Sequence, residues 1–220
     1  MYSVITIKRR GLMFIISAPS GTGKTTLAKK VIENDQYIDL STSCTTRQIR
    51  PGEVDGVHYY FKTEDQFKEL VKKGYLLEYA NIFGAYYGTL KEQVLDKLNR
   101  GKDVLFDIDW QGHRQLTSIA RPDVTSVFLL PPSKEELFHR LTIRNQDNEQ
   151  VIAERMARSD EEISHWYEYD YIIINRNIKQ SLEKLLSILR AERLKKERRI
   201  GLDDFINNLV YKKLTKTKIV

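Results

Sequence analysis

The chain has 220 residues, a formal net charge of +6 and a single cysteine. This length allows one domain with elaborations or two small ones, and one cysteine excludes an intramolecular disulfide. No segment approaches the roughly 20 apolar residues of a membrane span, and the N-terminus lacks the apolar stretch of a signal peptide, so we expect a soluble cytoplasmic protein.

The first predicted elements are a strand, a tight turn and a helix. Residues 12–16 are a short apolar run, and residues 24–33 carry apolar side chains at helical spacing. Between them, SAPSGTGKTTL approaches the phosphate-loop pattern of Gly, four residues and Gly-Lys-Ser/Thr, with Ala18 where the first glycine is usual. Backbone N–H groups of such a turn and of the following helix N-terminus attract anions. We therefore predict a phosphate loop; a glycine-rich turn without a ligand is the weaker alternative.

The residues of the predicted loop are suited to forming the turn and to binding phosphate and Mg²⁺. Gly21 and Gly23 supply the turn. The Lys24 ammonium reaches the β- and γ-phosphate oxygens, which makes it a catalytic candidate, and the Thr25 hydroxyl is offered to Mg²⁺. The residues predicted to bind the nucleotide are Ala18, Pro19, Ser20, Gly21, Thr22, Gly23, Lys24 and Thr25.

Residues 41–89 depart from a regular alternation of strands and helices. They are rich in Thr, Tyr, Gly and Arg, and they hold one predicted helix, 64–73, with a capping box formed by Thr63 and Gln66. Two arginines three residues apart, followed by tyrosine and threonine hydroxyls, supply donors that suit a phosphate monoester. We therefore predict an insertion that binds the phosphate acceptor.

The rest of the chain alternates between helical patterns and apolar, β-branched runs. In chain order these are helix 90–100, strand 104–108, strand 124–130, helix 133–141, strand 171–174 and helix 181–195. Such alternation indicates an α/β fold, a parallel sheet of the phosphate-loop NTPase type flanked by helices on both faces. Residues 133–168 are almost entirely helical and charged, and residues 201–220 form an extension, helical from 203 to 211.

Two aspartates end the strand predicted at 104–108. Alternation places Asp107 and Asp109 on the same side, at the carboxyl edge where ligands bind in open α/β sheets. A paired-carboxylate acid/base mechanism is the weaker interpretation, because phosphoryl transfer depends mainly on positioning and electrostatics.

Much of the excess positive charge lies late in the chain, in residues 190–199 and in the lysines after residue 211. We interpret residues 190–199 as the solvated face of a helix, with nucleic-acid binding as the less favoured alternative. The four histidines have no metal-ligand spacing, and Cys44 is interpreted as a packing residue.

Four segments carry a resemblance to one family: STSCTTRQIRPGEVDGVHYYF, LLEYANIFGAYYGT, LFDIDWQG and FLLPPSKEEL. They resemble the corresponding segments of guanylate kinases, in order and with natural spacing, over residues 11–199. The resemblance implies transfer of the γ-phosphoryl group of ATP to GMP and dGMP, with Mg²⁺, in purine nucleotide metabolism. It also implies one domain over residues 1–200, in which 41–89 bind GMP and 133–168 form a lid.

By position, the resemblance assigns the other site residues. Contacts to the GMP phosphate fall on Arg47, Arg50, Tyr59, Tyr87 and Thr89. Contacts to guanine fall on Ser43 and Glu78, with Asp107 and Asp109 nearby, and Asp109 is also a catalytic candidate that holds Mg²⁺ through water or orients an arginine. Lid arginines that reach the transferring phosphates fall on Arg140, Arg144 and Arg155. The guanine N1–H and N2–H donors suit one carboxylate, and O6 suits a hydroxyl.

Two other functions are also compatible with the sequence. An interaction module that resembles guanylate kinases would keep the fold without catalysis, although the intact Lys24 and Thr25 argue against a degraded loop. A nucleic-acid-binding NTPase would use the basic C-terminal helix and bind in a salt-sensitive way. A GTPase is disfavoured because no Asn-Lys-x-Asp guanine reader occurs in the sequence. Formation of a homo-oligomer is also left open.

Overall fold

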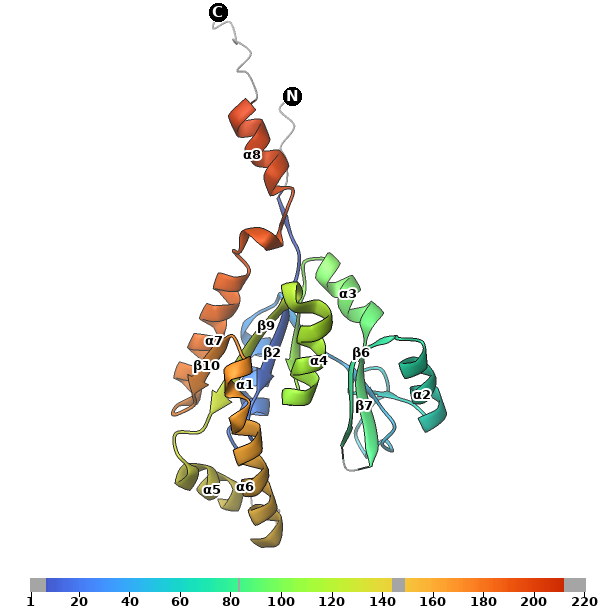
Figure 1. Cartoon of the computed structure of the whole chain (residues 1–220), viewed down its shortest axis with the longest axis vertical. Helices are drawn as coiled ribbons and strands as arrows, with labels where there is room; N and C mark the ends of the chain where they lie inside the picture. The colour runs from blue at the N-terminus through green and yellow to red at the C-terminus, as the bar shows by residue number, and fades with distance from the viewer. Residues whose placement is uncertain (1–6, 83, 144–148, 212–220) are drawn as a thin grey trace, which may run out of the picture.

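A five-stranded parallel sheet forms the centre of the structure. The computed structural model describes residues 7–82, 84–143 and 149–211. The strands of the central sheet are β2 (Met13–Ser17), β3 (Ile38–Leu40), β8 (Asp103–Asp107), β9 (Val124–Leu130) and β10 (Tyr171–Ile174). Their order is β10-β9-β2-β8-β3, and all neighbouring strands are parallel (Figure 1). The predicted parallel sheet is therefore confirmed.

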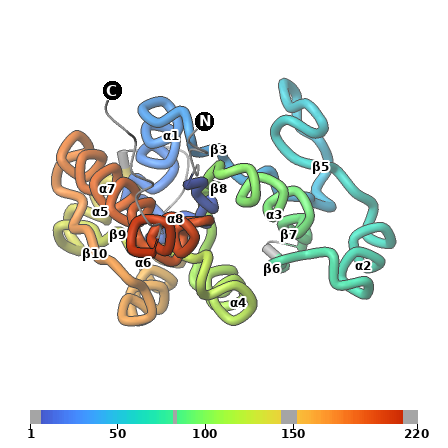
Figure 2. Tube along the Cα trace, turned by 90° about the horizontal axis from the view of Figure 1, so that it is seen from above, coloured from blue at the N-terminus to red at the C-terminus, as the bar shows by residue number. Residues whose placement is uncertain are grey.

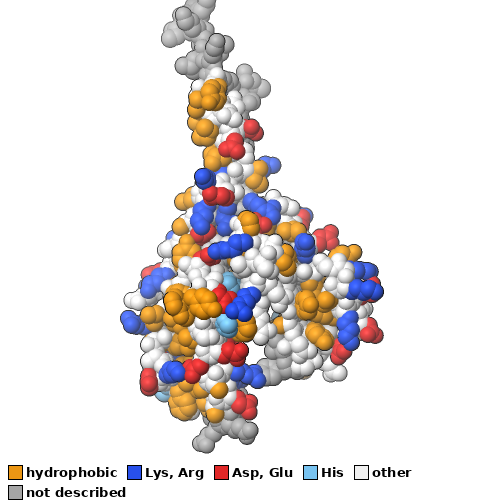
Figure 3. All heavy atoms as spheres, viewed as in Figure 1, with side chains coloured by type: hydrophobic (Ala, Val, Ile, Leu, Met, Phe, Trp, Pro, Cys, Tyr) orange, Lys and Arg blue, Asp and Glu red, His pale blue; other side chains and the backbone are white. Residues whose placement is uncertain are grey.

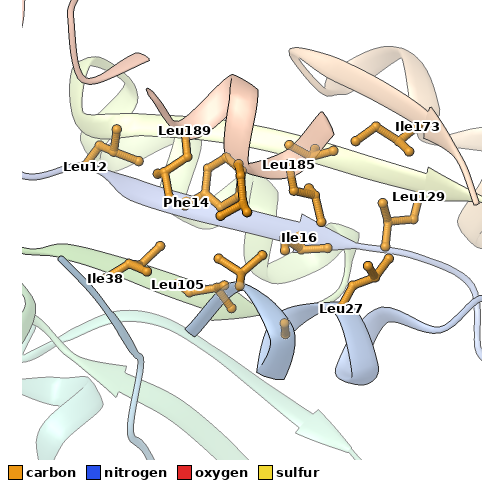
Figure 4. Packing of buried hydrophobic residues seen from close by; sticks show 14 residues of the cluster. Leu12, Phe14, Ile16, Leu27, Ile38, Leu105, Leu129, Ile173, Leu185 and Leu189 are labelled. Carbon is orange, nitrogen blue, oxygen red and sulfur yellow. The ribbon is translucent and has the colours of Figure 1, made fainter. Parts of the chain in front are cut away.

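Helices cover both faces of this sheet. They are α1 (Lys24–Asn34), α3 (Lys91–Asn99), α4 (Trp110–Ala120) and α7 (Ile178–Glu192). Leu12, Phe14 and Ile16 belong to a buried cluster that includes side chains of α1 and α7 (Figure 4). Met13 and Ile15 belong to a second cluster with side chains of α3 and α4. A strand covered on both faces needs a continuous apolar run, which is what residues 12–16 supply.

The apolar-pattern prediction missed α4 and β3. The buried residues of α4 are Gly112, His113 and Leu116, so its inward stripe contains one large apolar side chain. Only Ile38 of the three residues of β3 is buried. Apolar periodicity cannot reveal elements that bury so little apolar surface.

A second sheet is built from the predicted insertion. Its strands are β4 (Ser43–Thr45), β5 (Tyr60–Phe61), β6 (Leu76–Ile82) and β7 (Ala85–Leu90), in the order β5-β4-β7-β6. The helix α2 (Glu64–Lys72) packs on it through Phe67, in a cluster with Cys44. The predicted capping box is confirmed, since the Gln66 N–H donates to Thr63 Oγ1 at 3.2 Å and the Thr63 N–H donates to Gln66 Oε1 at 3.0 Å.

The charged segment after β9 forms two helices, α5 (Lys134–Ile143) and α6 (Glu149–Ser164). They pack on each other through Leu137, Leu141 and Ile152. Figures 1 and 2 show them on the opposite side of the molecule from α2 and the second sheet. No helix in the described ranges is long and apolar enough to cross a membrane.

The C-terminal segment leaves the body of the molecule. A short antiparallel pair joins β1 (Lys8–Arg9) to β11 (Arg199–Ile200), and α8 (Leu202–Tyr211) then projects outward (Figure 1). Apolar side chains along α8 are exposed to solvent (Figure 3). The helix predicted at 203–211 is confirmed.

The basic run 190–199 is not a solvated helix face throughout. The helix α7 ends at Glu192, and Arg193 donates to Asp35 at 2.7 and 2.9 Å and to Asp103 at 2.6 Å. Arg198 is 5% exposed and donates through Nε to the Glu192 carbonyl oxygen at 3.1 Å. The prediction was wrong for these two arginines. Arg193 pairs with acidic residues that lie far away in the chain, and Arg198 is buried against Glu192 at the end of α7.

Replacing Asp103 by Ala should destabilise the fold by about 3–5 kcal/mol, because removal of one partner leaves buried charge uncompensated. Asp103 is fully buried and accepts hydrogen bonds from Arg9, Arg193 and the Leu12 N–H. Urea unfolding measures the change. Asp204→Ala, on the exposed helix α8, is the control and should change stability by less than about 0.5 kcal/mol. Equal effects of the two variants would refute a structural role for the Asp103 cluster.

Candidate active site

The predicted phosphate loop connects β2 directly to α1. Gly21 and Gly23 have φ angles of 90° and 100°, in the left-handed region that favours glycine, so these two residues make the turn. Gly23 is the N-cap of α1, and it provides no side-chain cap. Uncapped N–H groups at a helix N-terminus form a favourable place for an anion.

Lys24 and Thr25 both meet the last residue of β8. Lys24 Nζ lies 2.7 Å from Asp107 Oδ1 and 3.3 Å from the Ile108 carbonyl oxygen. Thr25 Oγ1 lies 3.2 Å from Asp107 Oδ2. β2, which precedes the loop, and β8 are parallel neighbours with Ile16 opposite Asp107. Their carboxyl ends therefore lie at the same edge of the sheet.

The Thr25 hydroxyl and the Asp107 carboxylate are suited to Mg²⁺. Both groups offer the hard oxygen ligands that this ion prefers. Proteins commonly hold Mg²⁺ with one or two such groups, while water and substrate phosphates complete the octahedron. Thr25 and Asp107 could therefore hold the ion beside a bound nucleotide.

Asp109 does not belong to the strand that bears Asp107. β8 ends at Asp107, and Asp109 is the N-cap of α4, where its Oδ1 accepts the Gly112 N–H at 3.0 Å. The alternation argument for these two aspartates was therefore wrong, because the strand ends two residues earlier than the argument needs. The start of α4 nevertheless lies against the insertion, since a Cβ at Gly112 would lie 3.4 Å from Glu78 Oε2, and the negative charge of Asp109 raises the pKa of Glu78.

Glu78, Thr89 and Ser43 lie side by side on the strands β6, β7 and β4. Glu78 is opposite Thr89, and Thr89 is opposite Ser43. Glu78 is 5% exposed, and Thr89 Oγ1 donates to its Oε1 at 2.7 Å. Burial raises the pKa of Glu78 to about 7, with the Thr89 hydrogen bond lowering it and Asp109 raising it further. A buried carboxylate with this pKa is a strong acceptor for paired N–H donors.

Four residues predicted to contact the GMP phosphate, Arg47, Arg50, Tyr59 and Tyr87, lie in one part of the insertion, whereas the fifth, Thr89, donates to Glu78. Arg47 donates to both carboxylate oxygens of Glu53, at 2.8 and 2.9 Å, and its guanidinium lies 5.2 Å from the Tyr59 ring centroid. The Arg50 N–H donates to Glu53 Oε2 at 2.8 Å, and the Tyr59 and Tyr87 ring centroids are 6.0 Å apart. Sequence reasoning missed Glu53, whose pKa the Arg47 hydrogen bond holds at about 2.

The predicted lid arginine Arg140 contacts the phosphate loop. Arg140 Nη1 donates to the Thr22 carbonyl oxygen at 3.4 Å, and Nη2 donates to the Asn175 carbonyl oxygen at 3.4 Å. Arg155 is half-buried on α6. Arg144 lies outside the described residues.

Two further residues at the loop were missed by sequence reasoning. Asn175 is buried directly after β10, and its Nδ2 donates to the Thr22 carbonyl oxygen at 2.7 Å. Asp107 was predicted from its place at the carboxyl end of a strand, and the same signal, applied to the strand 171–174, would have marked Asn175. The pKa of Glu162 on α6 is raised overall, chiefly because the carboxyl group is buried. The Lys24 charge and the Ser20 backbone oppose this rise. No local pattern marks Glu162, because α6 meets the loop only in the fold.

Comparisons with known proteins agree with this geometry. The guanylate kinase family model matches residues 10–192. The chain is 54% identical to a guanylate kinase of Nitrobacter winogradskyi over 203 residues, which cover 92% of this chain and 93% of that protein. The chain belongs to the guanylate kinase family. A guanylate kinase of Sphingopyxis alaskensis is 51% identical over 210 residues, 96% of each chain.

A solved structure of the same family has the same fold. The crystal structure of guanylate kinase from Anaplasma phagocytophilum superposes with a TM-score of 0.74 at 35% identity, covering 92% of this chain and 96% of that one. The central sheet and the two additions to it are therefore an arrangement of the guanylate kinase family.

Binding of GMP, the acceptor implied by the resemblance, should release a proton from Glu78. With its pKa at about 7, the carboxyl group is mostly protonated at pH 6, whereas guanine donors need the ionised form. Binding therefore lowers this pKa, and affinity should rise up to about tenfold per pH unit from pH 6 toward 7 and level off above it. Calorimetry at pH 6.5 in buffers of different ionisation enthalpy counts the protons released.

Glu78→Gln is the control for this measurement, because the GMP phosphate also titrates near pH 6. The variant keeps the phosphate contribution and lacks the carboxyl group. Equal proton release by both proteins would show that Glu78 does not titrate on binding.

Proposed function

We propose that this chain is an ATP:GMP phosphotransferase, which converts GMP or dGMP and ATP to the diphosphate and ADP in cytoplasmic purine nucleotide metabolism. The observation that carries the proposal is the buried Glu78, held by Thr89 and facing Asp109. Asp109 is the N-cap of α4, two residues after Asp107, which pairs with Lys24 of the phosphate loop. This arrangement supports a site that combines a base-reading carboxylate with a phosphate loop.

Guanine is the base that suits the polar groups on the second sheet. Glu78 accepts the N1–H and N2–H donors of guanine, and Ser43 donates to O6. Adenine has an acceptor at N1 and a donor at position 6, so both hydrogen bonds to Glu78 would be lost. Asp107 and Asp109 complete the acidic surroundings of the base.

The arginines of the insertion and the lid serve the phosphates. The GMP phosphate is held by Arg47, Arg50, Tyr59 and Tyr87. The Thr89 hydroxyl, which the resemblance also assigns to the phosphate, donates to Glu78 instead. Glu53 supports this role, because its two-point pairing fixes the Arg47 guanidinium before GMP arrives. Arg140, Arg144 and Arg155 reach the transferring phosphates from the lid, and the contact of Arg140 with Thr22 supports this for the first of them.

The donor nucleotide binds the loop from Ala18 to Thr25. Its backbone N–H groups surround the phosphates, and Lys24 leaves Asp107 to contact the β- and γ-phosphate oxygens. Thr25 and Asp107 hold Mg²⁺, which when bound supplies positive charge to the phosphate oxygens. Asp109 either helps to hold this ion through water or orients an arginine of the lid.

The substrates are small molecules, and we assign catalysis to residues 1–200. Within them, residues 41–89 form the GMP-binding insertion and residues 133–168 form the lid. Residues 201–220 are an extension, and the proposal is compatible with a homo-oligomer. The rival interaction module is disfavoured by the intact pairing of Lys24 and Thr25 with Asp107.

Lys24→Met should leave the fold intact and lower kcat for GMP phosphorylation by roughly 10²-fold or more, because a preorganised charge on the transferring group is lost. A coupled assay of ADP formation measures it, with circular dichroism as the check of folding. Lys29→Met, an exposed change on the same helix, is the matched control and should keep turnover. A folded Lys24→Met protein with near-normal kcat would refute the catalytic assignment of the loop.

A further inference from the structure

A half-buried glutamine of α4 makes a two-point contact with the strand that carries Glu78. Gln115 Oε1 accepts the Tyr79 N–H at 3.0 Å, and Gln115 Nε2 donates to the Tyr79 carbonyl oxygen at 2.9 Å. β6 is an outer strand of the second sheet, so these backbone groups of Tyr79 face α4. The carboxamide offers a donor and an acceptor side by side, as a neighbouring strand would.

Leu77, the other chain neighbour of Glu78, also packs on α4. The register of β6 shifts between Leu76 and Glu78, and Leu77 lies in the same buried cluster as Leu116 of α4. The backbone of α4 also passes close to the carboxylate, since a Cβ at Gly112 would lie 3.4 Å from Glu78 Oε2. Both chain neighbours of Glu78 are therefore attached to α4, one by packing and one by Gln115.

We propose that Gln115 is a positioning residue that sets the orientation of Glu78 and, through it, the choice of guanine over adenine. This inference rests on the proposed function, in which Glu78 reads the base. The Tyr79 N–H belongs to the peptide unit that contains the Glu78 carbonyl, so its hydrogen bond to Gln115 fixes the backbone at Glu78. Two hydrogen bonds from one base edge need both carboxylate oxygens in the plane of that base, and a small rotation of the strand breaks this geometry.

The test compares kcat/KM for GMP and for AMP in wild type and Gln115→Met, which has a similar length and lacks both hydrogen bonds. The ratio of GMP to AMP should fall roughly 10–100-fold, because a misplaced carboxylate loses the guanine bonds and costs adenine nothing. KM for GMP should rise, while KM for ATP stays within about twofold. Gln115→Glu keeps the acceptor for the Tyr79 N–H and loses the donor, so its ratio should lie between the two.

Gln180→Met is the matched control, the same exchange at an exposed position on α7, and should leave the ratio unchanged. Thermal unfolding of each variant separates positioning from stability. A wild-type ratio in folded Gln115→Met, or in Gln115→Glu if the first variant does not fold, would overturn the inference and leave the proposed function standing. A wild-type protein that phosphorylates GMP and AMP equally would instead overturn the proposed function.

Discussion

The parallel pairing of β2 with β8 is the contact on which the rest of the site depends. It places Ile16 opposite Asp107, so the chain leaves both strands at the same edge of the sheet. From β2 it enters the phosphate loop, and from β8 it enters α4. A slip of one residue would exchange the buried clusters above and below the sheet, and both clusters are filled with apolar side chains that resist such a change.

The helix α4 connects the parts that the proposed reaction must bring together. Asp109 caps it beside the loop, and Gln115 attaches it to β6 of the insertion. At its start, the Trp110 ring stacks on His165 with centroids 3.8 Å apart, and His165 directly follows the last residue of α6. Loop, insertion and lid therefore share one helix as their common support. The Arg47–Glu53 pair, in contrast, is held entirely within the insertion.

Sequence reasoning predicted the features that local patterns encode. The apolar runs marked the principal strands of the central sheet, with 124–130 and 171–174 at their observed ends. The glycines at 21 and 23 marked the turn, and Thr63 with Gln66 marked the start of α2. These signals lie within a few residues of the structure they specify.

Features that depend on contacts across the fold could not be predicted in this way. α4 was missed because its buried face consists mainly of Gly112 and His113, which are not apolar marker residues. His113 is covered by Tyr169, which is distant in the chain. The inward turn of Arg193 depends on Asp35 and Asp103, which are distant in the chain. The hydrogen bond of Gln115 to Tyr79 and the charge interaction of Glu162 with Lys24 likewise appear only when α4 meets β6 and α6 meets the loop.

The proposed function requires that the buried carboxylate of Glu78 selects guanine for phosphorylation. The most direct measurement is kcat/KM of the wild-type protein with GMP and with AMP, at saturating ATP and equal pH. Unpaired buried polar groups cost about 1–3 kcal/mol each, and more when charged. GMP should therefore be preferred by roughly 10³-fold or more. Comparable turnover of the two nucleotides would show that Glu78 does not read the base.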